Sequence, residues 1–220
     1  STRIKKAYFC NRGERLFKPS FDISSLEGFD IIKIKTKAKY TFWQLNKGVL
    51  EWHYRFSGIP FVNEVSYDAY LKSIFSLPLN KINEGHIRIH MDLLSTKNKE
   101  NSSKKFRFID TRCLSKLVWH PNCIIEETPT YLNLPADLSN FKAISFSLFK
   151  KNVENTKMDL KTFLLNQKTL PSGIGNYLAC EICAHAKLSN WLPVRSMNKK
   201  QYEKLIQAIR IVANHSNSSI

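Results

Sequence analysis

The stretch FLLNQKTLPSGIGNYLACEI, residues 163–182, predicts two helices joined by a tight turn. Apolar residues recur at helical spacing on both sides of a proline and two glycines. Gly173 and Gly175 permit unusual φ angles and carry no Cβ that would block an approaching group. Asn176 opens the second helix, where free amides and the helix dipole favour an anion. Two interpretations stay open, a phosphate-binding turn and a helical hairpin with a glycine cap.

The charge of the chain indicates a polyanionic partner. The sequence has 34 Lys and Arg against 18 Asp and Glu, which gives a net charge of +16. Nucleic acid is the commonest partner for such a field, and solubility is the alternative explanation. No apolar run reaches the length of about 18 residues that a membrane span needs, and no signal peptide is recognisable. We expect an intracellular protein that binds nucleic acid and no membrane.

The first half of the chain reads as strands. Residues 31–45, IIKIKTKAKYTFWQL, alternate as one strand that has Ile32 and Ile34 on one side and lysines on the other. Residues 49–59 follow after the hairpin-like break NKG, and residues 86–94 alternate again. Residues 106–119 predict two strands around a turn at Asp110 and Thr111. Strands this short and frequent are typical of an antiparallel sandwich or barrel.

The second half changes to a helical period. Residues 120–134 contain two prolines and are interpreted as a linker. A helix is expected from about Ala136 to Lys150, and further helices carry apolar stripes up to the last residues. We therefore predict an α+β fold, with an antiparallel β-sandwich over residues 1–125 and an all-helical domain over residues 126–220.

The cysteines do not suggest a metal site. Five occur, and Cys180 and Cys183 form a CxxC pair. A structural zinc site needs four ligands, usually two such pairs, and the sequence has no second pair. We interpret the pair as two small thiols on one turn of helix, and we predict no metal and no cofactor.

Residues 163–182 resemble the helix–two-turns–helix motif of the formamidopyrimidine-DNA glycosylase / endonuclease VIII family. In that family an LLDQ segment precedes a G-[IVL]-G-N turn and a helix that contains Glu-Ile. Asn166 stands here where the Asp is usual. The family's turn grips the DNA backbone beside the lesion, so the resemblance implies that Gly173, Gly175 and Asn176 bind DNA phosphate.

Three stretches of the first half also resemble the family, in the same order. KTKAKYTFWQL is similar to RRAKYLLLEL, which implies that Lys39 contacts DNA phosphate. HYRFSG is similar to HLGMSG, and Phe56 takes the place of a residue that wedges into the duplex. RFIDTRCLSKLVW resembles RYTDPRRFGAWLW, which implies that Arg112 reads the orphaned opposite base and that Leu114 is a second wedge.

The resemblance does not extend to both ends of the family's pattern. Family members begin with a helix that carries Pro-Glu, whose proline amine is the nucleophile, and most continue into a zinc finger. The first residues here, STRIKKAYF, align with the family's first strand, and the zinc finger has no counterpart. Lys39 is the one candidate for a substitute amine, since a desolvated lysine near other cations can lose its proton.

The resemblance implies a bifunctional DNA glycosylase and AP lyase in base-excision repair of oxidised bases. The GIGNYL segment looks more like the endonuclease VIII branch, which implies oxidised pyrimidines. The expected partner is double- or single-stranded DNA with oxidised bases or abasic sites, bound by a monomer in the nucleus or another DNA-containing compartment. The alternative is a damaged-DNA-binding module without catalysis, and an RNA-binding protein is a third interpretation.

Overall fold

The computed structural model describes residues 2–55, 57–62, 84–95, 103–138, 146–153, 156–169 and 171–218. The chain forms two compact units, which we call the sheet unit and the helical unit. The sheet unit contains the described residues up to Thr36 and those from Tyr40 to Thr128. The helical unit contains the described residues from Pro129 onwards together with a short insert, Lys37–Lys39, from the first half of the chain.

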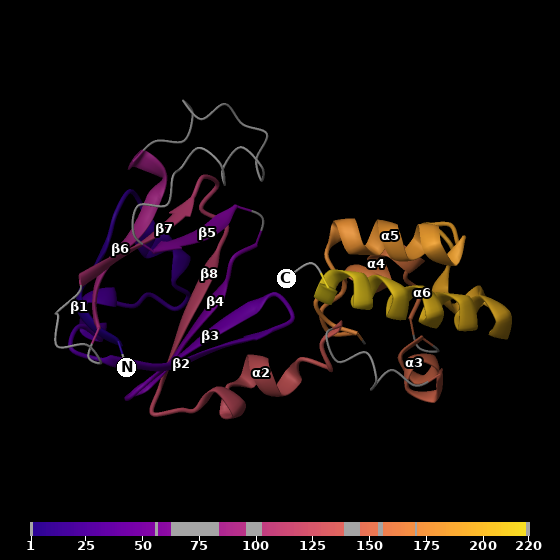
Figure 1. Ribbon diagram of the computed structural model, residues 1–220, viewed down its shortest axis with the longest axis horizontal. Coiled ribbons are helices and arrows are strands. Elements are labelled where there is room, and N and C mark those ends of the chain that lie inside the picture. Colours follow the sequence, from indigo (N-terminus) through magenta and orange to yellow (C-terminus); the bar gives the residue numbers. More distant parts are fainter. Residues whose placement is uncertain are drawn as a thin grey trace. The chain divides into compact units, whose positions relative to one another are not determined.

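The described strands of the sheet unit form one hydrogen-bonded series in the order β5-β7-β6-β1-β2-β3-β4-β8 (Figure 1). Every pairing with a recorded register is antiparallel. The strands are β1 (Thr2–Phe9), β2 (Asp30–Lys37), β3 (Tyr40–Leu45), β4 (Gly48–His53), β5 (Gly58–Val62), β6 (Ile87–Ser95), β7 (Ser103–Asp110) and β8 (Lys116–Pro121). Short 3-10 turns accompany them: η1 (Gly13–Leu16), η2 (Ile23–Leu26), η4 (Glu84–His86) and η5 (Ile125–Glu127).

The series folds back on itself as a sandwich, which confirms the predicted fold class. Trp43 on β3 and Trp52 on β4 lie far from β7 in the strand order, yet both pack edge-on against Phe106 of β7 at ring-centroid distances of 5.0 and 5.7 Å. Trp52 also packs 5.2 Å from Phe108. Such aromatic pairs bury large apolar areas, so these rings form the centre of the sandwich core.

The predicted strand over residues 31–45 is in fact two strands, β2 and β3. The chain turns at Ala38, whose φ of 56° is left-handed, so one alternating run becomes two neighbours in the sheet. Ile32 and Ile34, on the apolar side of that alternation, are 59% and 56% exposed, so this side of β2 does not face the core at these two positions. The turn also takes Lys39 off the lysine face of the strand and into the helical unit.

Other strand predictions agree with the structure. The NKG break forms a hairpin in which Leu45 pairs with Gly48. Residues 106–119 contain the ends of β7 and β8 around a turn that begins after Asp110. These two strands are not neighbours in the sheet, because β7 pairs with β5 and β6 whereas β8 pairs with β4.

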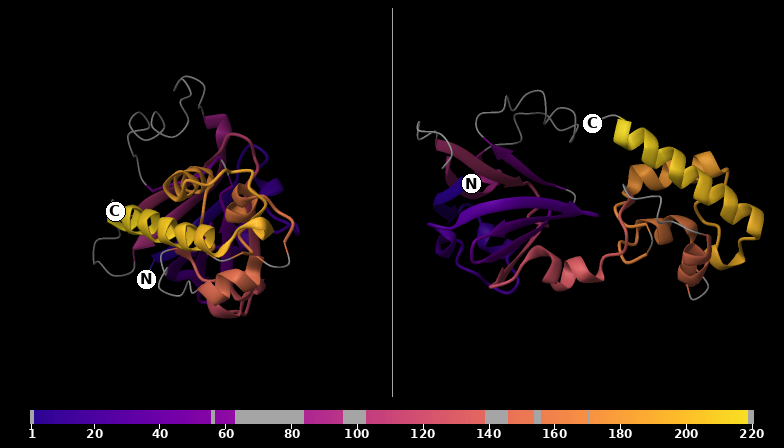
Figure 2. Two further views of the ribbon diagram at one scale, coloured as in Figure 1. Left: turned by 90° about the vertical axis from the view of Figure 1, so that its right-hand side faces the viewer. Right: turned by 60° about the horizontal axis from the view of Figure 1, so that its bottom comes forward.

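The helical unit has its own apolar core. Its described helices are α2 (Pro129–Asn133), α3 (Phe146–Val153), α4 (Leu160–Leu165), α5 (Asn176–Ala186) and α6 (Lys199–Ser218), with a 3-10 turn η7 (Val194–Ser196). The long helix α6, yellow in Figure 2, packs along α5. Phe149, Phe163 and Tyr202 meet edge-on inside this core, with Phe149 5.6 Å from Phe163 and 5.9 Å from Tyr202.

The helix expected from about Ala136 to Lys150 is wrong at its beginning. Ala136, Asp137 and Leu138 form an extended segment, which pairs in parallel with Ser172. Ser172 N donates to Ala136 O at 3.0 Å, and Leu138 N donates to Ser172 O at 2.9 Å. These hydrogen bonds to a segment far along the sequence compete with a local helix, and the described helix in this region is α3.

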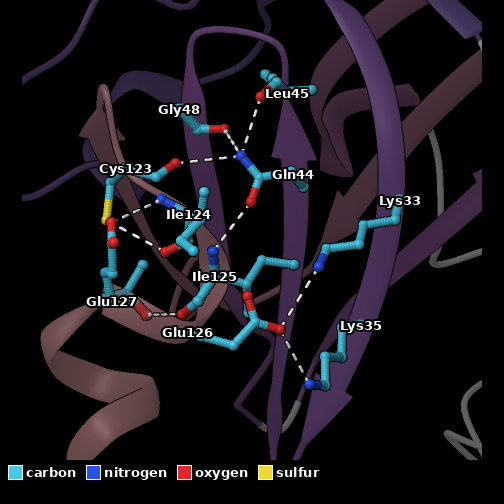
Figure 3. Close-up of polar contacts among 11 residues, drawn as sticks. Lys33, Lys35, Gln44, Leu45, Gly48, Cys123, Ile124, Ile125, Glu126 and Glu127 are labelled. Atoms are coloured by element: carbon cyan, nitrogen blue, oxygen red, sulfur yellow. Dashed lines mark hydrogen bonds and ion pairs between the residues drawn. The ribbon is translucent and has the colours of Figure 1, made fainter.

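Gln44 joins the β3–β4 hairpin to the loop after β8 (Figure 3). Its Nε2 donates to the carbonyls of Leu45, Gly48 and Cys123 at 3.0 to 3.1 Å, and its Oε1 accepts from Ile125 N at 2.9 Å. Gln44 is 7% exposed and Ile125 is fully buried. This single amide therefore satisfies backbone groups that water does not reach.

The variant Gln44→Leu should lower the free energy of unfolding by about 2 kcal/mol, because it leaves the buried Ile125 N–H without an acceptor. Urea unfolding followed by circular dichroism measures this change. Gln207→Leu on the exposed face of α6 is the control and should change stability by less than about 0.5 kcal/mol. Equal effects of the two substitutions would contradict the structural role of Gln44.

Candidate nucleic-acid interface

Two consecutive turns connect α4 to α5 in the helical unit. Asp159 caps the start of α4, since its carboxylate accepts from Thr162 N at 2.8 Å. The first turn begins at Asn166, whose carbonyl accepts from Thr169 N at 3.0 Å. The second turn contains the glycines and ends at Gly175, the N-cap of α5. The described residues thus have a helix–two-turns–helix arrangement.

Gln167 holds the second turn in place. Its Nε2 donates to the carbonyls of Leu165 at 2.8 Å and Ile174 at 3.1 Å, and its Oε1 accepts from Gly173 N at 2.8 Å. Gly173 has a φ of 93°, a conformation that side chains with a Cβ rarely adopt. The amide of Gly173 is therefore used inside the protein, and this glycine acts on the turn through its backbone conformation.

The start of α5 is an uncapped helix N-terminus. Gly175 is extended, with a φ of −97°, and no side chain caps the helix. Asn176 and Tyr177 are exposed, whereas Ile174 is fully buried and anchors the turn. The first amides of a helix have no intrahelical partner, and α5 directs its positive dipole end to this turn. Such a terminus favours an anion.

Lys39 lies beside Gly175 in the folded helical unit, although 136 positions of sequence separate the two residues. A Cβ built on Gly175 would stand 4.0 Å from Lys39 Cε. Burial lowers the pKa of Lys39 below its ordinary value of 10.5. The neighbouring Lys37 behaves differently, since its Nζ donates to Tyr131 O at 2.8 Å and lies 4.3 Å from the centroid of that ring. The structure thus brings a partly desolvated ammonium group to the glycine turn.

Asp137 connects the Lys39 turn to the glycine turn, a role that sequence reasoning missed. Its Oδ2 accepts from Ala38 N at 2.5 Å and lies 3.2 Å from a Cβ built on Gly173. One carboxylate therefore contacts both turns and fixes Lys39 near Gly175. The one sign of this role in the sequence is an acidic residue between the apolar Ala136 and Leu138, and local spacing does not show what that residue contacts.

Two turns of the sheet unit meet around Asp110. Its carboxylate is fully buried and accepts from Ser57 Oγ at 2.5 Å, Arg112 N at 3.1 Å and Ser115 N at 2.8 Å. Ser115 Oγ in turn donates to Tyr54 O at 3.0 Å. Asp110 therefore organises the turn after β7 and joins it to the turn between β4 and β5.

This junction brings together two of the sequence segments with predicted site residues. Arg112 is exposed and Leu114 is 42% exposed, both in the turn that Asp110 organises. Phe56, the predicted wedge, lies outside the described residues, but Ser57 and Gly58 beside it contact this turn. A Cβ on Gly58 would come 2.2 Å from Ser115 Oγ, so the two turns meet too closely for any side chain there.

The CxxC pair lies in α5. Cys183 is buried. Its burial, and to a smaller extent the nearby Cys180, raises the pKa of the Cys183 thiol to about 11. A thiol with such a pKa stays protonated at neutral pH and is a poor metal ligand. Within the described ranges, no three His, Cys, Asp or Glu residues are placed to hold a metal ion.

No described helix is long and apolar enough to cross a membrane. No family model matches the chain. A formamidopyrimidine-DNA glycosylase of Glaesserella parasuis is 27% identical over 193 residues, which cover 88% of this chain and 62% of that protein. The formamidopyrimidine-DNA glycosylase of Thermus thermophilus is 33% identical over 106 residues, 48% of this chain and 39% of the relative. The chain thus spans less than two thirds of the length of these curated relatives.

Solved structures show the same fold. Lactococcus lactis Fpg in complex with DNA that contains an abasic site has a TM-score of 0.76 and 16% sequence identity, over 99% of this chain and 72% of that one. A complex of the same protein with FAPY-dG DNA has the same TM-score and identity. The curated proteins show what the chain is similar to in sequence, and at 16% identity the solved structures establish the fold alone.

Proposed function

We propose that this chain is a DNA glycosylase of base-excision repair, related to the formamidopyrimidine-DNA glycosylase / endonuclease VIII family. The observation that supports this most directly is the position of Lys39 beside the uncapped start of α5, next to Gly175. A cation and free helix amides together form a binding site for one DNA phosphate. The relatives named formamidopyrimidine-DNA glycosylase and the fold of the DNA-bound Lactococcus lactis protein support the same function.

We propose that Lys39, Gly175 and Asn176 contact the phosphate directly. Gly173 belongs to the same site, and its contribution is the left-handed turn that allows DNA to approach, because Gln167 already accepts from its amide. On this proposal, residues 126–220 are the DNA-binding domain and residues 1–125 the glycosylase-type domain.

On the sheet unit, we propose that Phe56 and Leu114 fill the space of an everted nucleotide and that Arg112 reads the opposite base. Apolar side chains that enter a duplex stabilise the gap left by a flipped base. The arginine fork of donors suits a base edge. The exposure of Arg112 and Leu114 on a turn fixed by Asp110 supports this proposal.

The chemistry would combine base removal with AP-lyase cleavage, and Lys39 is the proposed amine of this chain. At an abasic site, the neutral Nζ adds to C1′ of the open-chain aldehyde and one water leaves, which forms a Schiff base. β-Elimination then breaks the bond to the 3′ phosphate. A lowered pKa supplies more neutral amine than an ordinary lysine has. A preference for oxidised pyrimidines, in a DNA-containing compartment, is the finer part of the proposal.

Borohydride trapping on abasic-site duplex tests the enzyme function. The wild-type chain should form a covalent adduct, since borohydride reduces the Schiff base to a stable amine, and mass spectrometry should place it on Lys39. Lys39→Arg should abolish the adduct yet retain DNA binding, whereas Lys39→Ala should also weaken binding by about tenfold. The trapping rate should rise with pH and level off below 10.5, because burial lowers the pKa of this amine.

Lys33→Ala, an exposed lysine of β2, is the control and should leave the adduct unchanged. Tight binding of the wild type without any adduct would instead support the damaged-DNA-binding module. Equal affinity for structured RNA and abasic duplex would support an RNA-binding protein. Duplexes with 5-hydroxyuracil and 8-oxoguanine compare the two lesion classes, and faster removal of the oxidised purine would contradict the pyrimidine preference.

A further inference from the structure

We infer that an arginine-lined pocket in the sheet unit is a second phosphate site, which holds the DNA backbone next to the turn that contains Arg112. The pocket has a volume of about 570 Å³. Three loops line it: the residues around η1, the residues around η4, and the turn after β7. Its cationic lining consists of Arg12, Arg15, Arg88 and Arg112. This inference rests on the proposed function.

Arg88 assembles the pocket from the three loops. Its Nε donates to Asp110 O at 2.7 Å, and its Nη1 donates to Gly85 O at 3.2 Å and to Asn11 O. Arg88 is 8% exposed, so its guanidinium is a buried structural part of the pocket floor. One carbonyl from each loop is thereby tied to the same side chain, which gives the pocket a defined shape before any ligand binds.

Gly13 allows the first loop to lie close against β6. A Cβ on Gly13 would stand 1.9 Å from Arg88 O, a distance that no side chain permits. Cys10 N donates to the same carbonyl at 2.9 Å. Arg12 follows with a left-handed φ of 71° and precedes η1, which carries Arg15. The close approach therefore places both arginines at the pocket.

The electrostatics of the pocket select an anion. None of the residues that line it is acidic. Two carboxylates lie nearby: Asp110 is buried and accepts three hydrogen bonds inside the protein, and Glu14 of η1 is close enough to Cys113 to contribute to the raised pKa of that thiol. Arg12, Arg15 and Arg112 are exposed, and among the described residues none of the three forms an ion pair. Guanidinium forks match phosphate oxygens in geometry and charge.

The pocket suits a backbone phosphate better than a small phosphorylated metabolite. It is open, and its lining has no Phe, Tyr or Trp ring on which a free nucleotide base could stack; His86 supplies the one ring in the lining. It shares Arg112 with the turn that carries the exposed Leu114. A DNA strand that contacts Leu114 would also pass Arg112 and the pocket, which belong to the same unit. The ligand that we assign to the pocket is therefore the backbone phosphates of that DNA strand next to Leu114.

The double variant Arg12→Ala/Arg15→Ala tests this site, with abasic duplex as the probe at several salt concentrations. The slope of log affinity against log salt should fall in magnitude by about 1 to 2, since each neutralised phosphate contributes about 0.9. Affinity at low salt should fall at least about tenfold. The matched control is Lys5→Ala/Lys6→Ala, two exposed cations of β1 outside the pocket, which should change the slope by less than about 0.5.

Alkylation of Cys113 gives a local readout, because this half-buried thiol also lines the pocket. Abasic duplex should slow its alkylation at least about threefold relative to Cys123, a thiol of the same unit outside the pocket, because bound DNA covers the partly exposed thiol of Cys113. Melting temperatures of both double variants should match the wild type, since the replaced side chains are exposed.

Equal salt slopes for the two double variants, or unprotected Cys113, would overturn the pocket as a DNA site. If inorganic phosphate at constant ionic strength binds the wild type but not the arginine variant, while their DNA affinities agree, the pocket serves a small phosphorylated ligand and the inference is wrong. A trapped adduct with equal slopes would remove this inference alone. A slope change without any adduct would retain the pocket and remove the glycosylase function.

Discussion

Asp110→Ala is expected to lower the free energy of unfolding by about 3 kcal/mol or more, because two of its donors are buried at Ser57 and Ser115. Alanine supplies no acceptor, so these groups would lose their partners without gaining water. The turn after β7 would also lose the contact at Arg112 N that sets its start. Equilibrium unfolding in urea measures the loss, with the m value as a check that unfolding remains two-state.

Ser57→Ala is the matched control for Asp110→Ala. It removes one donor but leaves the carboxylate with its two backbone partners, so the cost should be about 1 kcal/mol. If the two variants cost the same, Asp110 does not organise both turns. In addition, Asp110→Ala should weaken binding to abasic duplex, since Arg112 and Leu114 depend on the turn for their positions.

Arg88→Met should lower the free energy of unfolding by about 3 kcal/mol, because it leaves the carbonyls of three loops without their shared donor. Methionine retains much of the apolar volume, so the loss reports the hydrogen bonds more than a cavity. Thermal and urea unfolding both measure it. Arg88→Lys should be intermediate, since one ammonium group cannot reproduce the planar fork of donors.

Arg3→Met is the control for Arg88→Met, because it makes the same chemical change at an exposed position. Arg3 forms a surface ion pair with Asp30 at 2.9 Å, and its loss should cost less than about 1 kcal/mol. A cost for Arg88→Met as small as that for Arg3→Met would show that the three loops hold together without Arg88. The arginine pocket would then need another explanation for its shape.

Both predictions concern buried side chains that hydrogen-bond to more than one turn or loop, a role that sequence reasoning did not find. The sequence predicts a turn at Asp110, and the contacts of Asp110 to Arg112 N and Ser115 N agree with this, but its hydrogen bond with Ser57 Oγ also joins it to another turn. Arg88 lies on an alternating strand, where a charged residue is normally exposed. It is buried because its donors meet carbonyls from loops on both sides of it in the sequence. Such partners are not visible in local spacing.

The sequence by itself determined several local features of this protein. The period of two predicts that residues 31–45 and 86–94 are extended, the NKG break predicts the β3–β4 hairpin, and the two glycines before Asn176 predict the turn into α5. These features depend on the chemistry of adjacent residues, namely the φ preference of glycine and the alternation of side chains along a strand. They therefore require no knowledge of distant contacts.

The tertiary structure alone decided how the site is assembled. It turned the chain at Ala38 where the alternation predicted an unbroken strand, and it placed Lys39 beside Gly175 with Asp137 in contact with both turns. It also engaged the amide of Gly173 with Gln167. The physical reason is that burial makes each polar group take whichever partner the packed chain brings near, and that partner is set by the whole fold.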